Sequence, residues 1–356
     1  MRILAIESSC DETGAAVIEK NKTTIKVLSN ITATSLAIHA ATGGIIPENA
    51  AREQVKYIIP TIIKALCKSR IVNQESWEEA RIILKKEIDA IAVTHGPGLI
   101  GSLLVGVETA KTLSFAFNKP IIPVHHLLAH IYANFISPQT SIPYSLPTNP
   151  YPYIGLIVSG GHTDLLYFKS INNYKWLGGT RDDAAGEAID KIGRLLNLAY
   201  PAGPEIEERA KKITKPSIKF KSPLLNSDDF DFSFSGLKTE AMRFIQKNQE
   251  INEQIKNEVC FAVQKAVVDV LVKKTVRAAE LYNTNTILLG GGVSANETLM
   301  NEFKLKIENL KLKINVFSPK KTYCTDNAAM IGAYALMNYK PVNWRKIDAM
   351  PDLYFV

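Results

Sequence analysis

The sequence contains little cysteine. Four cysteines occur in 356 residues, and no two of them form a C-x-x-C pair: Cys10, Cys67, Cys260 and Cys324. Disulfide-stabilised domains and zinc ribbons use closely spaced cysteines. The sequence therefore indicates neither kind of framework, and we expect a reducing, cytoplasmic compartment.

A long uninterrupted apolar run is also missing. The apolar stretch at residues 88–117 is broken by His95, Pro97 and two charged residues. A membrane-spanning helix needs about 20 predominantly apolar residues. Near the start of the chain, Glu7 arrives too early for the apolar core of a signal peptide. We therefore expect no transmembrane helix, no export signal and no membrane association.

Acidic residues are fewer than basic ones, with 35 Asp and Glu against 42 Lys and Arg, which gives a formal charge of +7. Such an excess favours an acidic partner such as nucleic acid. Much of it lies in lysine runs at residues 211–221 and 304–321, and such runs are more often solvated faces than binding sites. The charge permits an RNA partner without requiring one.

The composition indicates two folded domains. Hydrophobic residues make up 46% of the chain and charged residues 22%, which is typical of globular proteins. A single core stops growing at about 250–300 residues. A chain of this length is therefore expected to divide.

The two halves of the sequence begin alike. Residues 3–9 form an apolar strand, a polar turn follows at residues 11–14, and a second apolar segment follows the turn. Residues 154–168 repeat this plan, and both segments predict β-hairpins. Each half continues with a strand, a glycine turn and a helix, at residues 88–117 and from residue 285 onward. This repetition predicts a duplicated α/β protein.

Several glycine turns are candidate phosphate or nucleotide sites, because backbone N–H groups at such turns can approach anions. The segment from His95 to Gly101 matches G-x-G-x-x-G, but no acidic residue stands about 20 residues later, as a dinucleotide site requires. The loops at residues 159–163 and 290–296 both follow apolar strands and could hold a nucleotide together. Either could equally be a tight turn. Asp190, on a predicted helix at residues 182–196, could bind ribose hydroxyls or belong to a salt-bridged helix face.

Two histidines, His126 and His130, are spaced four residues apart in a predicted helix. Residues at this spacing share one helix face, so both imidazoles could hold one transition-metal ion. The alternative is a pair of ordinary core or surface residues. A zinc protease would need a glutamate directly after the first histidine, and Leu127 occupies that position.

A series of short blocks resembles the bacterial tRNA N6-adenosine threonylcarbamoyltransferase family, once described as glycoprotein endopeptidases. The blocks follow one another in order along nearly the whole chain, at residues 6–13, 43–48, 95–98, 126–130, 158–163, 183–187, 200–204, 233–238, 290–296 and 323–329. The resemblance implies an actin-like ATPase fold, with two duplicated α/β domains around a nucleotide cleft. It implies domains at residues 1–136 with 327–356 and at residues 153–326, with a Pro-rich linker at residues 137–152.

The resemblance also implies the site residues. The metal ligands are His126, His130 and Asp326, a set that suits Fe²⁺, although Zn²⁺ or another divalent ion is possible. Asp11 and Glu12 are candidates for positioning or deprotonating the attacking amine, or are simple turn acids. The nucleotide contacts fall on Ile157, Val158, Ser159, Gly160, Gly161, Asp190, Gly203, Glu207 and Asn296.

The implied reaction moves a threonylcarbamoyl group from threonylcarbamoyl-AMP to N6 of adenosine 37 in tRNAs that read ANN codons, and releases AMP. ATP could occupy the same cleft. The implied partners are tRNA, a related non-catalytic paralogue and a small ATPase. A catalytically silent ATP-binding scaffold is the alternative, and a metalloendopeptidase is a remote one.

The sequence departs from the family pattern at two positions. Thr42 stands where the family commonly has an aromatic residue, and Gln54 stands where it commonly has histidine. This segment is expected to lie near partner or tRNA surfaces, so the departures bear on partner fit and loop rigidity rather than on the metal centre.

Overall fold

The chain forms two compact units in the computed structural model, which describes residues 1–22, 24–34, 46–70, 75–136, 150–248 and 250–355. The first unit comprises Met1–Thr148 and Pro319–Val356, and the second comprises Asn149–Ser318. The second unit is therefore inserted into the sequence of the first.

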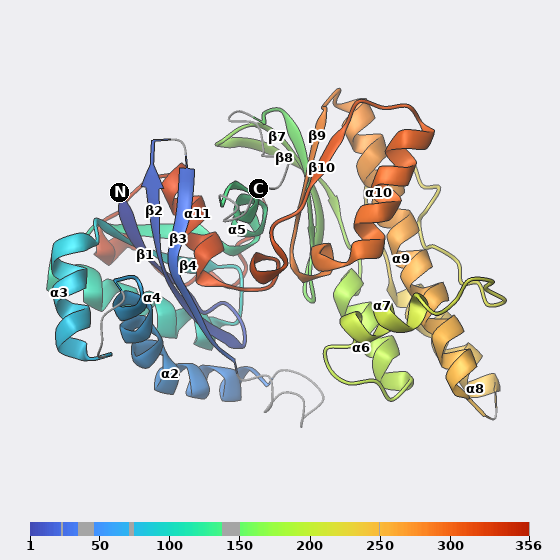
Figure 1. Ribbon diagram of the computed structural model, residues 1–356, viewed down its shortest axis with the longest axis horizontal. Coiled ribbons are helices and arrows are strands. Elements are labelled where there is room, and N and C mark those ends of the chain that lie inside the picture. The colour runs from blue at the N-terminus through green and yellow to red at the C-terminus, as the bar shows by residue number, and fades with distance from the viewer. Residues whose placement is uncertain (23, 35–45, 71–74, 137–149, 249, 356) are drawn as a thin grey trace. The chain divides into compact units, whose positions relative to one another are not determined.

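The first unit is built on a five-stranded sheet with the order β3-β2-β1-β4-β5 (Figure 1). β1 (Arg2–Glu7), β2 (Glu12–Asn21) and β3 (Thr24–Thr34) form an antiparallel meander, which β4 (Ala90–Gly96) and β5 (Ile121–His125) extend in parallel. Parallel neighbours need long crossover connections, usually helical. α4, between β4 and β5, supplies one of them.

Both faces of this sheet are buried. Along β1, Leu4 and Ile6 face one core and Ile3 and Ala5 face another, all with 0% exposure. Strands covered on both faces read as continuous apolar runs, which explains the segment from residue 3 to residue 6. The first core is covered by α2 (Pro47–Lys68), α3 (Trp77–Glu87) and α4 (Ile100–Phe117), and the second by α5 (His126–Tyr132) and α11 (Ala328–Met337).

α4 is the one helix among the described residues that is long and apolar enough to cross a membrane by length and composition. It packs against α2 and β4. Val107 and Ala110 lie fully buried in the first core. These contacts are those of a core helix.

The second unit repeats the strand order of the first. Its sheet runs β10-β9-β6-β7-β8, with β6 (Tyr153–Val158), β7 (Thr163–Ser170) and β8 (Asn173–Gly179) antiparallel and β9 (Thr286–Gly290) and β10 (Asn315–Phe317) parallel. In each unit the first strand of an antiparallel meander, β1 or β6, also pairs in parallel with a later strand, β4 or β9. This confirms the predicted duplication and both predicted hairpins.

One large core holds the helices of the second unit against its sheet. Ile154, Leu156 and Val158 of β6 face this core. Asn252 is the N-cap residue of α9, and its side chain accepts a hydrogen bond from the Ile255 N–H, as N-cap side chains do. The helices are α6 (Ala185–Leu195), α7 (Gly203–Ala210), α8 (Ser235–Lys247), α9 (Glu253–Leu281) and α10 (Glu297–Asn309).

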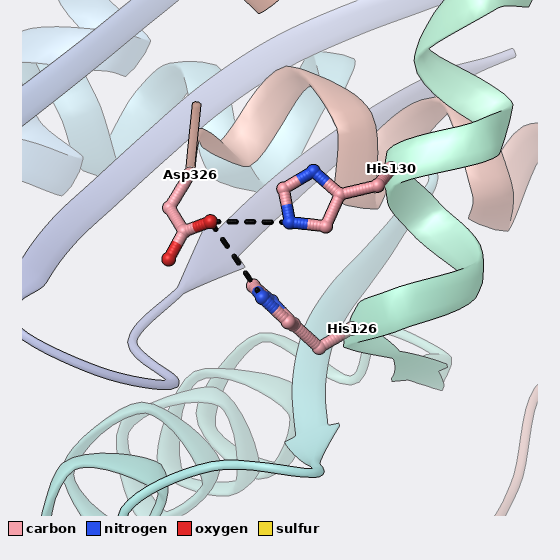
Figure 2. Close-up of side chains that lie close together, drawn as sticks. All are labelled: His126, His130 and Asp326. Carbon is pink, nitrogen blue, oxygen red and sulfur yellow. Dashed lines mark ion pairs between the residues drawn. The ribbon is translucent and has the colours of Figure 1, made fainter. Parts of the chain in front are cut away.

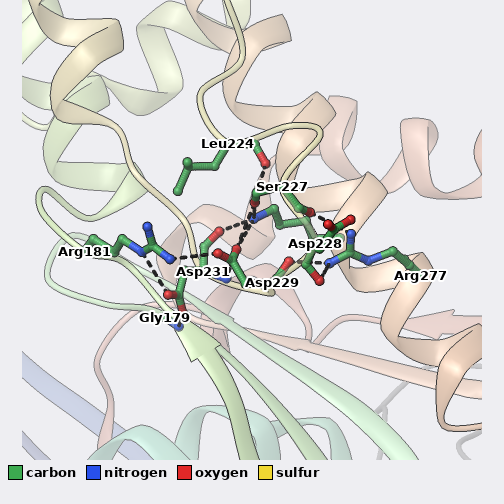
Figure 3. A network of polar contacts seen from close by, with 9 residues as sticks. Gly179, Arg181, Leu224, Ser227, Asp228, Asp229, Asp231 and Arg277 are labelled. Atoms are coloured by element: carbon green, nitrogen blue, oxygen red, sulfur yellow. Dashed lines mark hydrogen bonds and ion pairs between the residues drawn. The ribbon is translucent and has the colours of Figure 1, made fainter.

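A polar network ties the loop at residues 224–231 to α9 (Figure 3). Lys274 of α9, whose side chain is 1% exposed, lies 3.1 Å from Asp229 Oδ1 and donates to the Asp231 carbonyl. Arg181 binds the same two acids, at 2.7 Å and 2.9 Å. A buried ammonium is stable only when paired and hydrogen-bonded, and the loop supplies these partners.

The expected domain boundaries need correction. The units meet in the sequence at residues 318 and 319, not at 326 and 327, so Asp326 belongs to the first unit together with both histidines. The physical reason is that residues 319–327 lead into α11, which packs on β1 and β2. Most of the proposed linker, residues 137–149, lies outside the described residues, as do Thr42 and the Gly43–Gly44 pair.

Candidate metal centre and nucleotide loops

The two histidines lie on α5, a seven-residue helix that directly follows β5. His126 is its first residue, and His130 follows one turn later. Both are buried, with 6% and 1% exposure. Their ring centroids are 4.9 Å apart at an interplanar angle of 81°. The predicted shared helix face is therefore present.

Asp326 reaches the same point from the segment before α11 (Figure 2). Its Oδ1 lies 3.2 Å from His130 Nε2 and 3.6 Å from His126 Nε2. The next residue, Asn327, fixes this segment by accepting from the Met330 N–H and donating to the carbonyls of Tyr323 and Thr325. The helix cap thus positions the carboxylate.

The three side chains fit a divalent metal ion. Their candidate ligand atoms all lie within 4.8 Å of one another. Atoms that bind one ion at about 2.1 Å lie roughly 3.0–3.4 Å apart for angles between 90° and 109°, close to the distances found. Both ring nitrogens of His130 are buried without a hydrogen-bond partner, and its Nε2 faces the carboxylate. Two imidazoles and one carboxylate leave coordination positions open, as in iron(II) sites.

The protonation of His126 depends on its two carboxylate neighbours. Burial lowers the pKa of His126, but the carboxylates of Glu7 and Asp326 outweigh burial and raise it to about 9. The metal-free imidazole is therefore protonated at neutral pH. Because a histidine ligand must be neutral, metal binding releases this proton.

Acidic residues crowd the turn between β1 and β2. Burial, followed by the carboxylates of Asp326, Asp11 and Glu7, raises the pKa of Glu12 to about 8. The structure thus brings Glu12 and Asp11 into the electrostatic field of Asp326. A carboxyl group that titrates near neutral pH suits proton transfer, and the roles predicted for Asp11 and Glu12 stay predictions.

Gln54 holds this turn in place. Its side chain is fully buried on α2, and its Nε2 donates to the carbonyls of Cys10 at 2.9 Å and Glu12 at 3.0 Å. Gln54 itself therefore contacts the turn rather than a surface, and the nearness of its segment to partner or tRNA surfaces stays a prediction. Gln54 faces inward because α2 packs its buried face against β2.

In the second unit, the predicted phosphate loop joins β6 to β7. Ile157 and Val158 end β6, and Ser159 closes the turn through hydrogen bonds with His162. A Cβ atom added to Gly160 or Gly161 would meet nothing within 4 Å. The backbone of these two glycines is open to an approaching ligand, as the sequence predicted for a phosphate loop.

Asp190 of α6 binds the start of α7. Its Oδ1 accepts from the Ala202 N–H at 2.7 Å, beside Gly203. Burial raises the pKa of Asp190. The positive charge of Arg194, one turn further along α6, acts in the opposite direction and lowers this pKa, so both readings of Asp190, a ribose contact and a member of a charged helix face, stay predictions.

The other two predicted nucleotide contacts serve the first turn of α10. Asn296 caps this helix by accepting from the Leu299 N–H, and its amide donates to Gln264. Glu207 accepts from the Glu297 N–H at 2.8 Å. Both side chains thus have structural partners, and their ribose and base contacts stay predictions.

The G-x-G-x-x-G match has a structural explanation. A Cβ atom on Gly96 would lie 2.0 Å from the Met350 carbonyl oxygen, and one on Gly98 would lie 2.4 Å from the Ser9 carbonyl oxygen. The chain's own backbone occupies the space that a dinucleotide would need. These glycines permit close packing of the N-terminal turn and the C-terminal tail.

Comparison with known proteins identifies close relatives. The sequence matches the family described as "tRNA N6-adenosine threonylcarbamoyltransferase" over residues 26–333. A curated protein of that name in Moorella thermoacetica is 42% identical, and the match covers 99% of this chain and 96% of the relative. The one in Kosmotoga olearia is 43% identical, and the match covers 100% of this chain and 99% of the relative. A third, in Clostridium kluyveri, is 44% identical and covers 99% and 97%.

Solved structures show similarity at the level of the fold. A crystal structure of T. kodakarensis HypF superposes with a TM-score of 0.58 at 13% identity, covering 95% of this chain and 48% of that one. A full-length HypF in a phosphate- and nucleotide-bound form gives 0.57, again at 13% identity, with coverage of 95% and 55%. The fold extends over nearly the whole chain.

Proposed function

This chain belongs to the tRNA N6-adenosine threonylcarbamoyltransferase family and transfers a threonylcarbamoyl group to tRNA, and we propose that His126, His130 and Asp326 form its metal centre. The donor is threonylcarbamoyl-AMP, and the acceptor is N6 of adenosine 37 in tRNAs that read ANN codons. AMP is the leaving group. The convergence of three buried or half-buried ligands from distant segments carries the proposal.

The metal centre binds the threonylcarbamoyl end of the donor. A bound Fe²⁺, Zn²⁺ or similar ion would supply Lewis-acid polarisation of a carbonyl oxygen. His126 and His130 hold the ion from one rigid helix, and Asp326 contributes the negative charge. Three protein ligands would leave coordination positions of such an ion free for substrate oxygens.

Asp11 and Glu12 position or deprotonate the attacking N6 amine. The N6 amine must lose a proton as it forms the new bond to the carbamoyl carbon, while the bond to the phosphate oxygen breaks. Glu12 is the stronger candidate for receiving that proton in its ionised form; its pKa is about 8 in the metal-free protein, and the positive charge of an ion held by Asp326 would lower it. Gln54 keeps the turn that carries both acids in one conformation.

The loop of the second unit at residues 157–161 takes the phosphate of the adenylate, or that of ATP. Open backbone at Gly160 and Gly161 supports this assignment. Asp190, Gly203, Glu207 and Asn296 take the ribose and the base. Asp190 and Glu207 would then share their carboxylates between the helix ends they now bind and the ligand.

The partners follow from the family and the charge. The +7 net charge suits contact with tRNA phosphates, and we propose a related non-catalytic paralogue and a small ATPase as protein partners. tRNA modification and the low cysteine content together favour a cytoplasmic location.

The test compares three variants with the wild type. Purified chain, with its partners if transfer requires them, receives threonylcarbamoyl-AMP and unmodified tRNA, and modified adenosine and AMP are measured by mass spectrometry. Asp326→Asn and His126→Ala should each lower transfer by about 100-fold, equivalent to roughly 3 kcal/mol, and should lose bound metal. Asp352→Asn makes the same chemical change at an exposed position of the same unit and should leave both unchanged.

The outcomes separate the functions. If Asp326→Asn and His126→Ala transfer the threonylcarbamoyl group as well as the wild type does, the metal centre takes no part in the reaction. A wild type that binds ATP but releases no AMP from the donor with tRNA would instead identify a silent scaffold.

A further inference from the structure

One buried carboxylate lies directly behind the metal centre. Glu7, the last residue of β1, is 1% exposed. Its Oε1 accepts from the Ser9 N–H at 2.6 Å, and its Oε2 accepts from the Thr94 hydroxyl. The same Oε2 lies 3.2 Å from His126 Nδ1. Three donors from three segments thus fix one carboxylate.

The two ring nitrogens of His126 have different surroundings. Nε2 faces Asp326 and the proposed ion, whereas Nδ1 faces Glu7 and the Ser9 hydroxyl, which is also 3.2 Å away. A neutral imidazole carries its proton on only one nitrogen. Nε2 can bind a metal only if that proton is on Nδ1. An ionised carboxylate at Nδ1 accepts this proton's hydrogen bond and so selects the required tautomer.

His130 provides an internal contrast. Its Nδ1 is buried but has no hydrogen-bond partner among the described residues, so no carboxylate in this part of the chain selects its tautomer. The hydrogen bonds from Ser9 and Thr94 also prevent Glu7 from rotating away. The arrangement is therefore specific to His126.

We propose that Glu7 is a positioning residue of the metal centre: it holds the Nδ1–H of His126, directs Nε2 toward the ion and raises the basicity of that ligand. This inference rests on the proposed metal centre. Outer carboxylates of this kind change metal affinity by about 10–100-fold when they are replaced. Nothing in the sequence distinguishes Glu7 from the other acids near the first turn.

The decisive variant is Glu7→Gln. The amide oxygen can replace Oε1 opposite the Ser9 N–H, which places the amide NH₂ beside His126. That NH₂ would donate to Nδ1 and favour a proton on Nε2, the tautomer that cannot bind metal. Zn²⁺ affinity, measured by competition with a chromophoric chelator, should fall by about 10–100-fold.

The matched control is Glu108→Gln on α4, where the carboxylate is 58% exposed and Zn²⁺ affinity should not change. Glu7→Asp keeps the charge but shortens the reach, and it should give an intermediate loss. The ¹⁵N shifts of the His126 ring in the Zn²⁺-loaded protein should show Nδ1 protonated and Nε2 bound in the wild type. Glu7→Asp should weaken that signature.

Two results would overturn the proposal. One is a Glu7→Gln protein that binds Zn²⁺ within twofold of the wild type. The other, which applies even if Glu7→Gln does not fold, is an unchanged ring signature and affinity in Glu7→Asp. A wild type that binds no Zn²⁺ would instead refute the metal centre itself, so the two failures are distinguishable.

Discussion

A single methyl group at Gly98 should disturb the metal centre from a distance. Alanine at this position would place its Cβ 2.4 Å from the Ser9 carbonyl oxygen, 2.9 Å from Ser9 Cβ and 3.0 Å from Ser9 C. Favourable contacts between such atoms lie near 3.5–4.0 Å, so the backbone of Ser9 must move by about 1 Å. That backbone also donates to Glu7 and accepts from the Leu99 N–H.

The expected magnitude follows from the rigidity of the atoms that must move. Inserting a methyl group into a well-packed region costs about 1–3 kcal/mol. At about 2–4 °C per kcal/mol for a unit of this size, Gly98→Ala should lower the melting temperature by roughly 2–12 °C. Zn²⁺ affinity should fall as well, because the displaced Ser9 N–H helps to fix the carboxylate behind His126.

The assay combines thermal unfolding with Zn²⁺ titration. The control is Gly236→Ala on α8, where an added Cβ meets nothing within 4 Å. There the change should stabilise by up to about 1 kcal/mol, because alanine is the better helix former. If Gly98→Ala melts with the wild type and binds Zn²⁺ equally well, the turn at Ser9 is not rigid and the reasoning fails.

Three further predictions address the second unit and the RNA partner. Burial raises the pKa of Asp164 to about 6 despite a hydrogen bond from Trp176; the contribution of Asp164 to stability is therefore greatest below about pH 4 and is lost as pH rises through 6. Asp164→Asn should remove up to about 3 kcal/mol of this dependence in melting curves between pH 4 and 8, and an identical pH profile would contradict it. Lys274→Met leaves Asp229 and the Asp231 carbonyl without a buried donor and should cost about 1–3 kcal/mol in urea unfolding; an unchanged midpoint would show that the network of Figure 3 adds no stability. Binding of unmodified tRNA should weaken by at least about 10-fold between 50 and 200 mM salt, and salt-independent affinity would exclude phosphate contacts.

The repeated strands could be predicted because they depend on local pattern. The apolar run at residues 3–6 and the polar turn after it indicated a hairpin, and residues 154–168 indicated another. The His126 and His130 pair was equally visible, because helix geometry alone puts residues at this spacing on one face. Asp326 could be assigned only through family resemblance, since no local rule joins it to α5.

The contacts behind the metal site could not be predicted. Glu7 reaches His126 and Thr94 through the parallel pairing of β1 with β4 and the helix after β5. Gln54 reaches Cys10 across the packing of α2 on the sheet. The family resemblance placed its segment near partner or tRNA surfaces, and no local rule of sequence joins α2 to the turn at Cys10. The one available signal was the helix face, because Ala50 and Ile58, four residues before and after Gln54, are apolar and share that face with it.

The domain boundary was misplaced for a related reason. Residues 319–327 contain no long element, and their membership of the first unit depends on where α11 packs. The capping role of Asn296 was missed because the residue follows a glycine loop, which suggested a ligand. An Asn directly before a helix that begins with Glu297 is also a helix-start signal.

The insertion of one unit within the other orders events during translation. The ribosome makes Ile3, Ala5 and both histidines early, but α11, which covers that face of the sheet, comes only after the whole second unit. A nascent first unit therefore carries an apolar face that α5 covers only in part. The proposed metal centre likewise lacks its carboxylate until Asp326 has been synthesised, because Asp326 lies just before α11.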